Sequence, residues 1–290
     1  MGQWNPWELP HCNNGGFGAV SNEGVRDLHA IGLDSEDHGG AYYLEDWSVS
    51  TPVSGVAVYF HHLEQHLIRA IHQADVVVGC VAWLTHPDII AALSTVPRGV
   101  ALVVQKEDFL RPDFGQHTSV SPRWRETLRQ QYAQLPWTFD RNTFPAPLGQ
   151  CSYCSGPEVE PVRCVGNYNG DQDPAFPRMH HKFLVFCRVV ATHYYAITDE
   201  GDILGELTAD PYDIYSPLTW ESDENIEPYA VWTGSFNLTK NATLSLENAV
   251  YITIPEIVDA YYKEWVQLEA FSEPLNWQHE WVAPEWRIGS

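Results

Sequence analysis

The sequence of 290 residues predicts an α/β protein in which helices flank a mixed β-sheet. Residues 76–83 form a near-continuous apolar run, as expected of a strand covered on both faces. Residues 60–74 carry apolar side chains at helical spacing, and a second apolar run follows at 99–104. This order of helix and strand favours a mixed α/β sheet.

Local signals predict two further helices in the first half. Pro87 fits the first turn of a helix between the two apolar runs. Residues 123–132 read as another helix, in which Arg125 and Arg129 share a face because they are four residues apart. That face either binds a polyanion or is simply solvated. Both arginines, together with Arg178, are candidate substrate-binding residues.

The second half contains a segment with several chemically active side chains. His180, His181 and Lys182 open an apolar run that ends at Phe186. Because side chains alternate along a strand, we expect His180 and Lys182 to share a face and His181 to point away. We also expect residues 161–165 to form the neighbouring strand.

Two later segments add polar side chains. Ser235 and Asn237 follow another short apolar run, and Glu247 lies in a strand predicted over 246–254. A helix is predicted over 255–268. Together the strand ends would gather a nucleophile, a cation, amide and hydroxyl groups and a carboxylate, which indicates a phosphate-handling site.

These residue types suit phosphoryl transfer. The neutral imidazole of His180 can attack phosphorus and form a covalent phosphohistidine. Lys182 and Asn237 would bind the equatorial oxygens, where charge sits in the transition state. Glu247 would hold the imidazole by its other ring nitrogen, which fixes the tautomer.

Three motifs, in this order, resemble those of the phospholipase D superfamily, with one copy of its HKD motif: His180-x-Lys182, Gly234-Ser235-x-Asn237 and Glu247-Asn248. Residues 67–83 and 87–93 are similar to the family's opening helix, strand and helix. The resemblance implies a phospholipase D-like fold with one half-site per chain. One position departs from the family pattern, because Cys187 stands where the family has an Asp five residues after the lysine.

The resemblance also implies a reaction with two histidines, one that attacks and one that protonates the leaving oxygen. The chain has one His-x-Lys, so the resemblance implies a homodimer in which His180 of each protomer meets its mate. Lys182, Ser235 and Asn237 would bind phosphate, Glu247 would orient His180, and no catalytic metal is needed.

Single-HKD relatives are frequently nucleases, so the resemblance favours a metal-independent endonuclease that cleaves DNA or RNA. A phospholipase D-type lipid phosphodiesterase is the second enzymatic interpretation, although the sequence has no basic amphipathic stretch. A catalytically impaired binding or scaffold protein is the non-enzymatic alternative.

A cysteine array separates the two halves of the chain. Cys151, Cys154 and Cys164 have the spacing C-x2-C-x9-C, which suits a structural zinc turn with His11 or Cys12 among the candidates for a fourth ligand. The alternative is reduced cysteines in a cytosolic loop.

The formal net charge is −22, which is unusual for a protein that binds nucleic acid. The charge is uneven, however: residues 98–188 hold eleven Lys and Arg against nine acids, and the remainder holds five against 29. The basic middle is a candidate phosphate-binding face. Without an 18-residue apolar run or a secretory signal, we expect a soluble, cytoplasmic protein.

The sequence divides into three parts. Residues 1–55 read as a loop-rich extension, residues 56–272 as the phospholipase D-like domain, and residues 273–290 as an aromatic, acidic tail. Within the domain, an acidic insert at 188–233 has ten acids and no Lys or Arg between 199 and 227. One hypothesis is a mobile lid beside the mouth of the active site, and the other is a surface excursion without a regulatory role.

Overall fold

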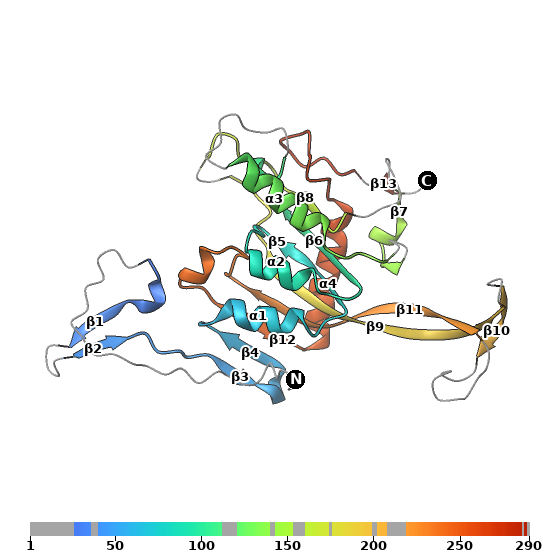
Figure 1. Cartoon of the computed structure of the whole chain (residues 1–290), viewed down its shortest axis with the longest axis horizontal. Helices are drawn as coiled ribbons and strands as arrows, with labels where there is room; N and C mark the ends of the chain where they lie inside the picture. The colour runs from blue at the N-terminus through green and yellow to red at the C-terminus, as the bar shows by residue number, and fades with distance from the viewer. Residues whose placement is uncertain are drawn as a thin grey trace.

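The computed structural model describes residues 26–35, 40–111, 121–139, 143–152, 160–173, 176–198, 202–207, 219–285 and 287–288. Its centre is a mixed sheet in the order β3-β4-β12-β11-β9-β5-β6-β8, with β10 beside β9 (Figure 1). The pairs β5–β6 and β6–β8 are parallel and the others antiparallel. The predicted mixed α/β sheet is therefore confirmed. Its strands are β3 (Val49–Thr51), β4 (Val56–Tyr59), β5 (Val76–Val81), β6 (Gly99–Gln105), β8 (Val162–Val165), β9 (Lys182–Ile197), β10 (Ile203–Leu207), β11 (Thr219–Gly234) and β12 (Ala249–Ile252).

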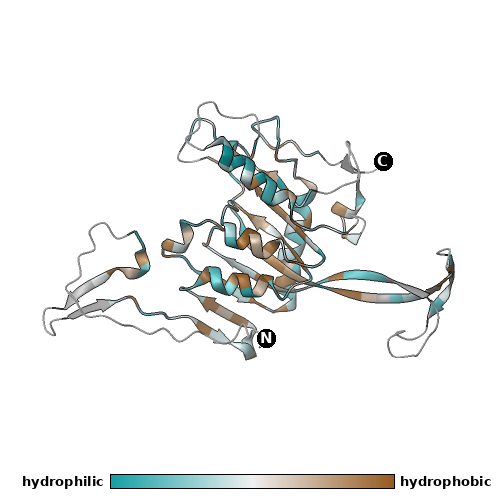
Figure 2. Cartoon of the chain, in the orientation of Figure 1, coloured by the Kyte–Doolittle hydropathy of each residue, from teal (hydrophilic) through white to brown (hydrophobic). Residues whose placement is uncertain are grey.

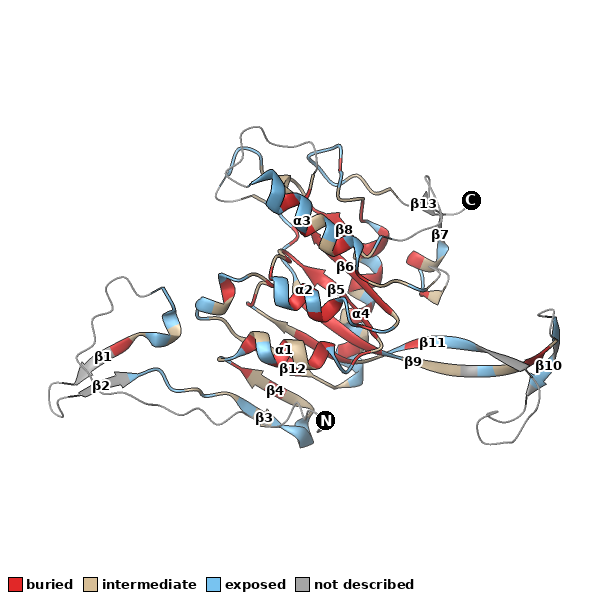
Figure 3. Cartoon of the chain, in the orientation of Figure 1, coloured by how far each residue is buried: buried red, intermediate tan, exposed pale blue. Residues whose placement is uncertain are grey.

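Helices cover both faces of the sheet. Side chains of β5 alternate between two apolar clusters, with Val77 in the cluster that contains α1, α2 and α3 side chains and Val78 in the cluster that contains α4. Figures 2 and 3 show the central strands as apolar and buried. The near-continuous apolar run at 76–83 is thus explained, as predicted, by a strand that is covered on both faces. The helices are α1 (Leu63–Ile71), α2 (Pro87–Leu93), α3 (Pro122–Ala133) and α4 (Pro255–Ala270).

Shorter elements lie around this core. Strand β3 belongs to the central sheet, so the sheet begins before the predicted boundary at residue 56. Residues 1–25 of the predicted extension lie outside the described residues. The remaining elements are β1 (Gly32–Ser35) paired with β2 (Gly40–Tyr43), β7 (Cys151–Ser152) paired with β13 (Arg287–Ile288), and 3-10 turns at Leu28–Ala30, Pro52–Ser54, Asp108–Leu110, Leu148–Gln150 and Ala242–Leu244.

The acidic insert forms part of a long hairpin arm, made of β9 and β11 with β10 at its far end (Figure 1). The pairing runs from Phe183 opposite Thr233 to Ile197 opposite Thr219. The candidate site lies where β9 begins and β11 ends, so the arm leaves the sheet at the other end of the same strands. At about 3.3 Å per residue, its tip is tens of ångströms from the site. The hypothesis of a lid beside the active-site mouth of the same chain is therefore wrong for the described part of the insert, residues 188–198, 202–207 and 219–233.

The predicted pairing of residues 161–165 with the strand that follows His180 is also wrong. Strand β8 lies at the edge of the sheet beside β6, and β9 lies between β11 and β5. The helix α2 connects β5 and β6 as parallel neighbours, and β8 extends that parallel half. Order along the chain does not fix order in the sheet.

Two buried cations hold the C-terminal segment against the parallel strands. Lys106 is fully buried and donates to Glu273 Oε1 at 2.5 Å and to two main-chain oxygens of the tail. Arg163 is also fully buried and donates to Ser272 Oγ at 2.7 Å and to Glu285 at 2.8 Å. These two cations are unavailable to a ligand, so the phosphate-binding face predicted from the basic middle is smaller than its charge count suggests.

Candidate active site

His180 and Lys182 lie together where β9 begins. The main chain there is held against the end of β5, because Val81 pairs with Lys182 and the Ala82 N–H donates to His181 O at 2.9 Å. Lys182 Nζ lies 3.1 Å from His180 Nδ1 and 3.2 Å from Nε2. His181 points toward α4, with Nε2 3.4 Å from Glu264. The predicted alternation is confirmed.

Gln105 fixes the segment before His180. Its Oε1 accepts a hydrogen bond from the Met179 N–H at 2.8 Å, and its Nε2 donates to Asn167 O at 2.7 Å. The side chain is buried at the last position of β6. Sequence reasoning missed Gln105, although a polar residue that ends an apolar run was an available signal.

The loop with Ser235 and Asn237 lies beside the same sheet edge, since β11 is the neighbour of β9. The Leu238 N–H donates to Trp83 O at 3.1 Å, and the Thr85 N–H donates to Leu238 O at 2.8 Å. These bonds hold the loop against the end of β5. Asn237 Oδ1 is buried, and among the residues that the structure describes it has no hydrogen-bond partner.

Glu247 contacts Ser235 and not His180 in the part of the chain that the structure describes. Ser235 Oγ donates to the Glu247 carboxylate and accepts from the Asn248 N–H at 3.0 Å. The reason is sheet order: Glu247 precedes β12, and β11 separates β12 from β9. Within one chain, Lys182 rather than Glu247 lies against the His180 imidazole.

The environment of His180 favours its neutral form. Burial lowers its pKa below the ordinary value, and the charges of Lys182, Arg178 and His181 lower it further. Burial also lowers the pKa of Lys182, while the Glu247 carboxylate acts in the opposite direction. A neutral imidazole beside a cation is what nucleophilic attack on a phosphodiester requires.

Trp83 and Glu107 also belong to the site, and sequence reasoning missed both. The Trp83 and His180 rings meet edge-on with centroids 5.9 Å apart. Trp83 Nε1 donates to Glu107 Oε1 at 3.0 Å, and Arg178 Nη1 lies 3.7 Å from the same oxygen. The available signal was that Trp83 and Glu107 follow the ends of two parallel strands, which share an edge. The structure thus places Arg178, a predicted substrate-binding residue, at the site.

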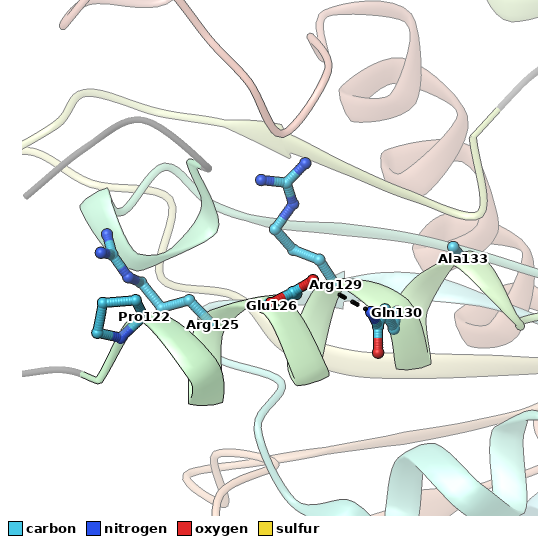
Figure 4. Close-up of a pocket in the computed structure, with 6 residues that line it drawn as sticks. All are labelled: Pro122, Arg125, Glu126, Arg129, Gln130 and Ala133. Atoms are coloured by element: carbon cyan, nitrogen blue, oxygen red, sulfur yellow. Dashed lines mark hydrogen bonds between the residues drawn. The ribbon is translucent and has the colours of Figure 1, made fainter.

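Arg125 and Arg129 come together on α3, apart from His180 and its contacts. They line a pocket of about 520 Å³, and Arg125 is 6% exposed. Figure 4 shows both guanidinium groups on the same side of the helix. The predicted shared face is confirmed, and their role in substrate binding stays a prediction.

The zinc turn stays a prediction, because Cys154 and the side chain of Cys151 lie outside the described residues. Cys164 is fully buried, and its Sγ donates to Pro274 O at 3.3 Å. Burial raises the pKa of its thiol well above the usual range, which disfavours the thiolate that zinc binds.

A group of Glu64, His86 and Asp88 has atoms close enough to hold a cation. His86 uses both ring nitrogens otherwise: Nδ1 accepts from the Asp88 N–H at 3.2 Å, and Nε2 lies 3.6 Å from Glu64. Nδ1 thus caps the start of α2, and an imidazole that accepts through Nδ1 carries its proton on Nε2, which leaves no nitrogen lone pair for a metal.

The mixed α/β sheet, with one His-x-Lys pair beside a Gly-Ser-x-Asn loop at the strand ends, agrees with the resemblance to the phospholipase D superfamily. The chain belongs to the same family as uncharacterized protein L381 of Acanthamoeba polyphaga mimivirus. The two share 31% identity over 240 residues, which span 78% of this chain and 69% of L381. No protein-family model matches the sequence.

Solved structures resemble the chain at low identity. They include NucT from Helicobacter pylori (14% identity, TM-score 0.38, 73% of this chain and 95% of that chain). They also include Nuc, a phospholipase D family member from Salmonella typhimurium (16%, 0.35, 76% and 99%). A third is phosphatidylserine synthase from Haemophilus influenzae Rd KW20 (15%, 0.37, 83% and 44%). Similarity at these TM-scores adds no argument about function.

Among the helices that the structure describes, none is both long and apolar enough to cross a membrane.

Proposed function

We propose that the chain is a phosphodiesterase of the phospholipase D superfamily that cleaves nucleic acid, with His180 as the nucleophile. The observation that carries the proposal is the neutral His180 imidazole against the Lys182 ammonium, 3.1 Å from Nδ1 to Nζ. Asn237 lies in the adjoining loop after β11, and its side-chain NH2 group would donate to a phosphate oxygen. A nucleophile, a cation and a polar amide at one sheet edge are the groups that phosphoryl transfer needs.

The reaction has two steps. A ring nitrogen of His180 forms a bond to phosphorus while the bond from phosphorus to the leaving oxygen breaks, and a second imidazole gives that oxygen a proton. The second imidazole then takes a proton from water, which attacks phosphorus and breaks the bond to His180. The products are a hydroxyl end and a phosphate monoester, and neither step uses a metal ion.

The second imidazole is His180 of another copy in a two-fold dimer. His180 is exposed on the protein surface, which leaves it accessible to a partner. An isologous interface around this edge would bring the two residues together, since a two-fold axis places equivalent side chains opposite each other.

The test is cleavage of single- and double-stranded DNA and RNA in EDTA, with His180→Ala compared to His181→Ala. The His181 control removes an adjacent imidazole that points to α4. We expect His180→Ala to lose at least about 1,000-fold in rate and His181→Ala to remain within about threefold of wild type.

Equal loss in both variants, or cleavage that survives His180→Ala, would reject the assigned nucleophile. Hydrolysis of an aryl phosphodiester without cleavage of any nucleic acid would keep the chemistry and reject the substrate.

A further inference from the structure

Trp83 adjoins both halves of the candidate site. Its ring meets the His180 imidazole edge-on, with an angle of 82° between the ring planes. Its main-chain oxygen accepts from the N–H of Leu238, the residue after Asn237. The indole is half-buried, so part of its surface is open to solvent. A ligand held between His180 and Asn237 would therefore lie beside this ring.

Glu107 fixes the indole in place. Its carboxylate accepts the Trp83 Nε1–H at 3.0 Å, and its main-chain oxygen accepts the Trp277 Nε1–H at 3.2 Å. Trp277 is buried, so Glu107 is tied to the body of the protein as well as to the site. A ring fixed before a ligand arrives loses little conformational entropy when it binds one.

Arg178 supplies a positive charge at the same place. Its guanidinium lies 3.7 Å from the Glu107 carboxylate, and its side chain remains 29% exposed. It lies two residues before His180, so it is within reach of a phosphate next to the one under attack. The surroundings of Trp83 thus combine an aromatic ring, a cation and a carboxylate.

We propose that Trp83 is the stacking platform for an unpaired nucleobase next to the phosphodiester that His180 attacks, with Arg178 on the adjoining phosphate. Single-stranded nucleic acid is then the substrate class. This inference rests on the proposed function and deepens it. Glu107 is a positioning residue that acts through Trp83.

The chemistry favours a base over the other groups that a phosphodiester carries. An aromatic ring stacks on a base whatever the identity of that base, because every base has a π-face. A base in a duplex is stacked and paired on the inside, and is therefore unavailable to the indole. An acyl chain would need an apolar groove, whereas Arg178, Glu107 and Lys182 surround this ring with charge.

The experiment measures binding with turnover blocked by His180→Asn. Two labelled ligands of equal charge are compared by fluorescence anisotropy: a thymidine octamer, and an octamer of abasic deoxyribose phosphates. We expect Trp83→Leu to weaken binding of the thymidine octamer about tenfold and to change the abasic octamer less than about twofold. Trp83→Phe keeps an aromatic ring and should retain most of the preference for thymidine.

Trp124→Leu is the matched control, because Trp124 is 40% exposed on α3 and contacts Phe109 rather than His180. It should leave both affinities unchanged. Equal weakening of both ligands by Trp83→Leu would mean that Trp83 only supports the site, and no weakening would mean that no base stacks there. Either result overturns the inference.

Failure of the inference is separable from failure of the function. Wild type that cleaves nucleic acid in EDTA, with Trp83→Leu keeping its thymidine preference, rejects the platform alone. Wild type that neither binds nor cleaves nucleic acid rejects the function and the platform together.

Discussion

His180 is surrounded by groups that keep its imidazole neutral. Burial, Lys182, Arg178 and His181 all lower its pKa, in that order of size. These influences favour the neutral, nucleophilic form of the His180 imidazole and oppose its protonated form. A bound phosphodiester adds negative charge that offsets the two cations, so the second imidazole of a dimer would hold its proton most readily with substrate present.

The first prediction concerns this pKa. We expect the His180 imidazole to titrate below 6.5 in wild type. In Lys182→Met it should titrate higher, because a cation that opposes protonation is gone. NMR titration of the ring protons measures both values, with the resonance assigned by its absence in His180→Ala. The acid limb of kcat/KM should follow the wild-type value, since activity needs the neutral form and rises as pH passes that pKa. A wild-type value at or above 6.5 would contradict the argument.

The second prediction concerns Cys187, which stands in place of the Asp of the family pattern. The thiol is fully buried in the apolar cluster on the α4 face, and burial raises its pKa well above the usual range. Cys187→Asp, which restores the pattern, should therefore lower the free energy of unfolding by about 3 kcal/mol or more without raising activity.

Cys187→Ala is the matched control and should cost about 1 kcal/mol, because it leaves only a small cavity. Urea denaturation measures both variants. An Asp variant as stable as wild type and more active would mean that the substitution of Cys for Asp weakens the site.

The sequence could predict that His180 and Lys182 lie on one face of a strand, because period-two alternation and motif spacing are local. It missed Gln105 and Glu107, although both lie at the end of an apolar run, because their roles show only once β6 is placed beside β5. It placed Glu247 against His180, whereas among the described residues of one chain Glu247 accepts a hydrogen bond from Ser235. A contact between strand ends depends on sheet order, and β11 lies between Glu247 and His180.

At the scale of elements, strands buried on both faces were predictable and the arm was not. Strands β5 and β6 are buried at every position, so they appear as apolar runs. The outer part of β11 has few apolar side chains, and Asp223, Glu224 and Asn225 are exposed. Such a stretch lacks the hydrophobic pattern that identifies a strand, and its acidity suggests a loop.

The third prediction is that the arm is dispensable for catalysis in each chain. Removing residues 191–224 and joining Val190 to Asn225, which pair in the hairpin, through an Asn-Gly turn keeps the remaining register. Cleavage rate and affinity in EDTA should stay within about twofold, because the arm leaves the sheet at the end opposite His180. The unfolding free energy should fall by about 1 kcal/mol or less from loss of the exposed Arg98–Glu224 ion pair.

Glu224→Gln in the intact arm controls for that ion pair. A tenfold change in rate or affinity in the shortened protein alone would show that the arm contacts substrate or a second copy.

At the scale of the whole molecule, the positions of the cations decide how an acidic protein could bind a polyanion. The net charge is −22, and two of the basic residues of the middle segment, Lys106 and Arg163, are buried in pairs that hold the tail. Among the residues that the structure describes, Lys182 and Arg178 are the lysine and arginine that act on the pKa of His180. A polyanion would therefore bind through a small cationic site on an acidic protein, so affinity should be modest and, with few phosphates neutralised, only weakly dependent on salt.

The fourth prediction tests whether one active site needs two chains. Wild type and His180→Ala, mixed in equal amounts and refolded together, should form about one quarter wild-type dimers, one half mixed dimers and one quarter mutant dimers. A mixed dimer has one His180 where the reaction uses two, so the mixture should retain about one quarter of the activity of the same amount of wild type. Chains that act alone would retain about one half. A parallel mixture with His181→Ala should keep nearly all activity, because that imidazole faces Glu264 on α4. Sedimentation of each mixture confirms that dimers formed, and one half of the activity from fully dimeric protein would reject the shared site.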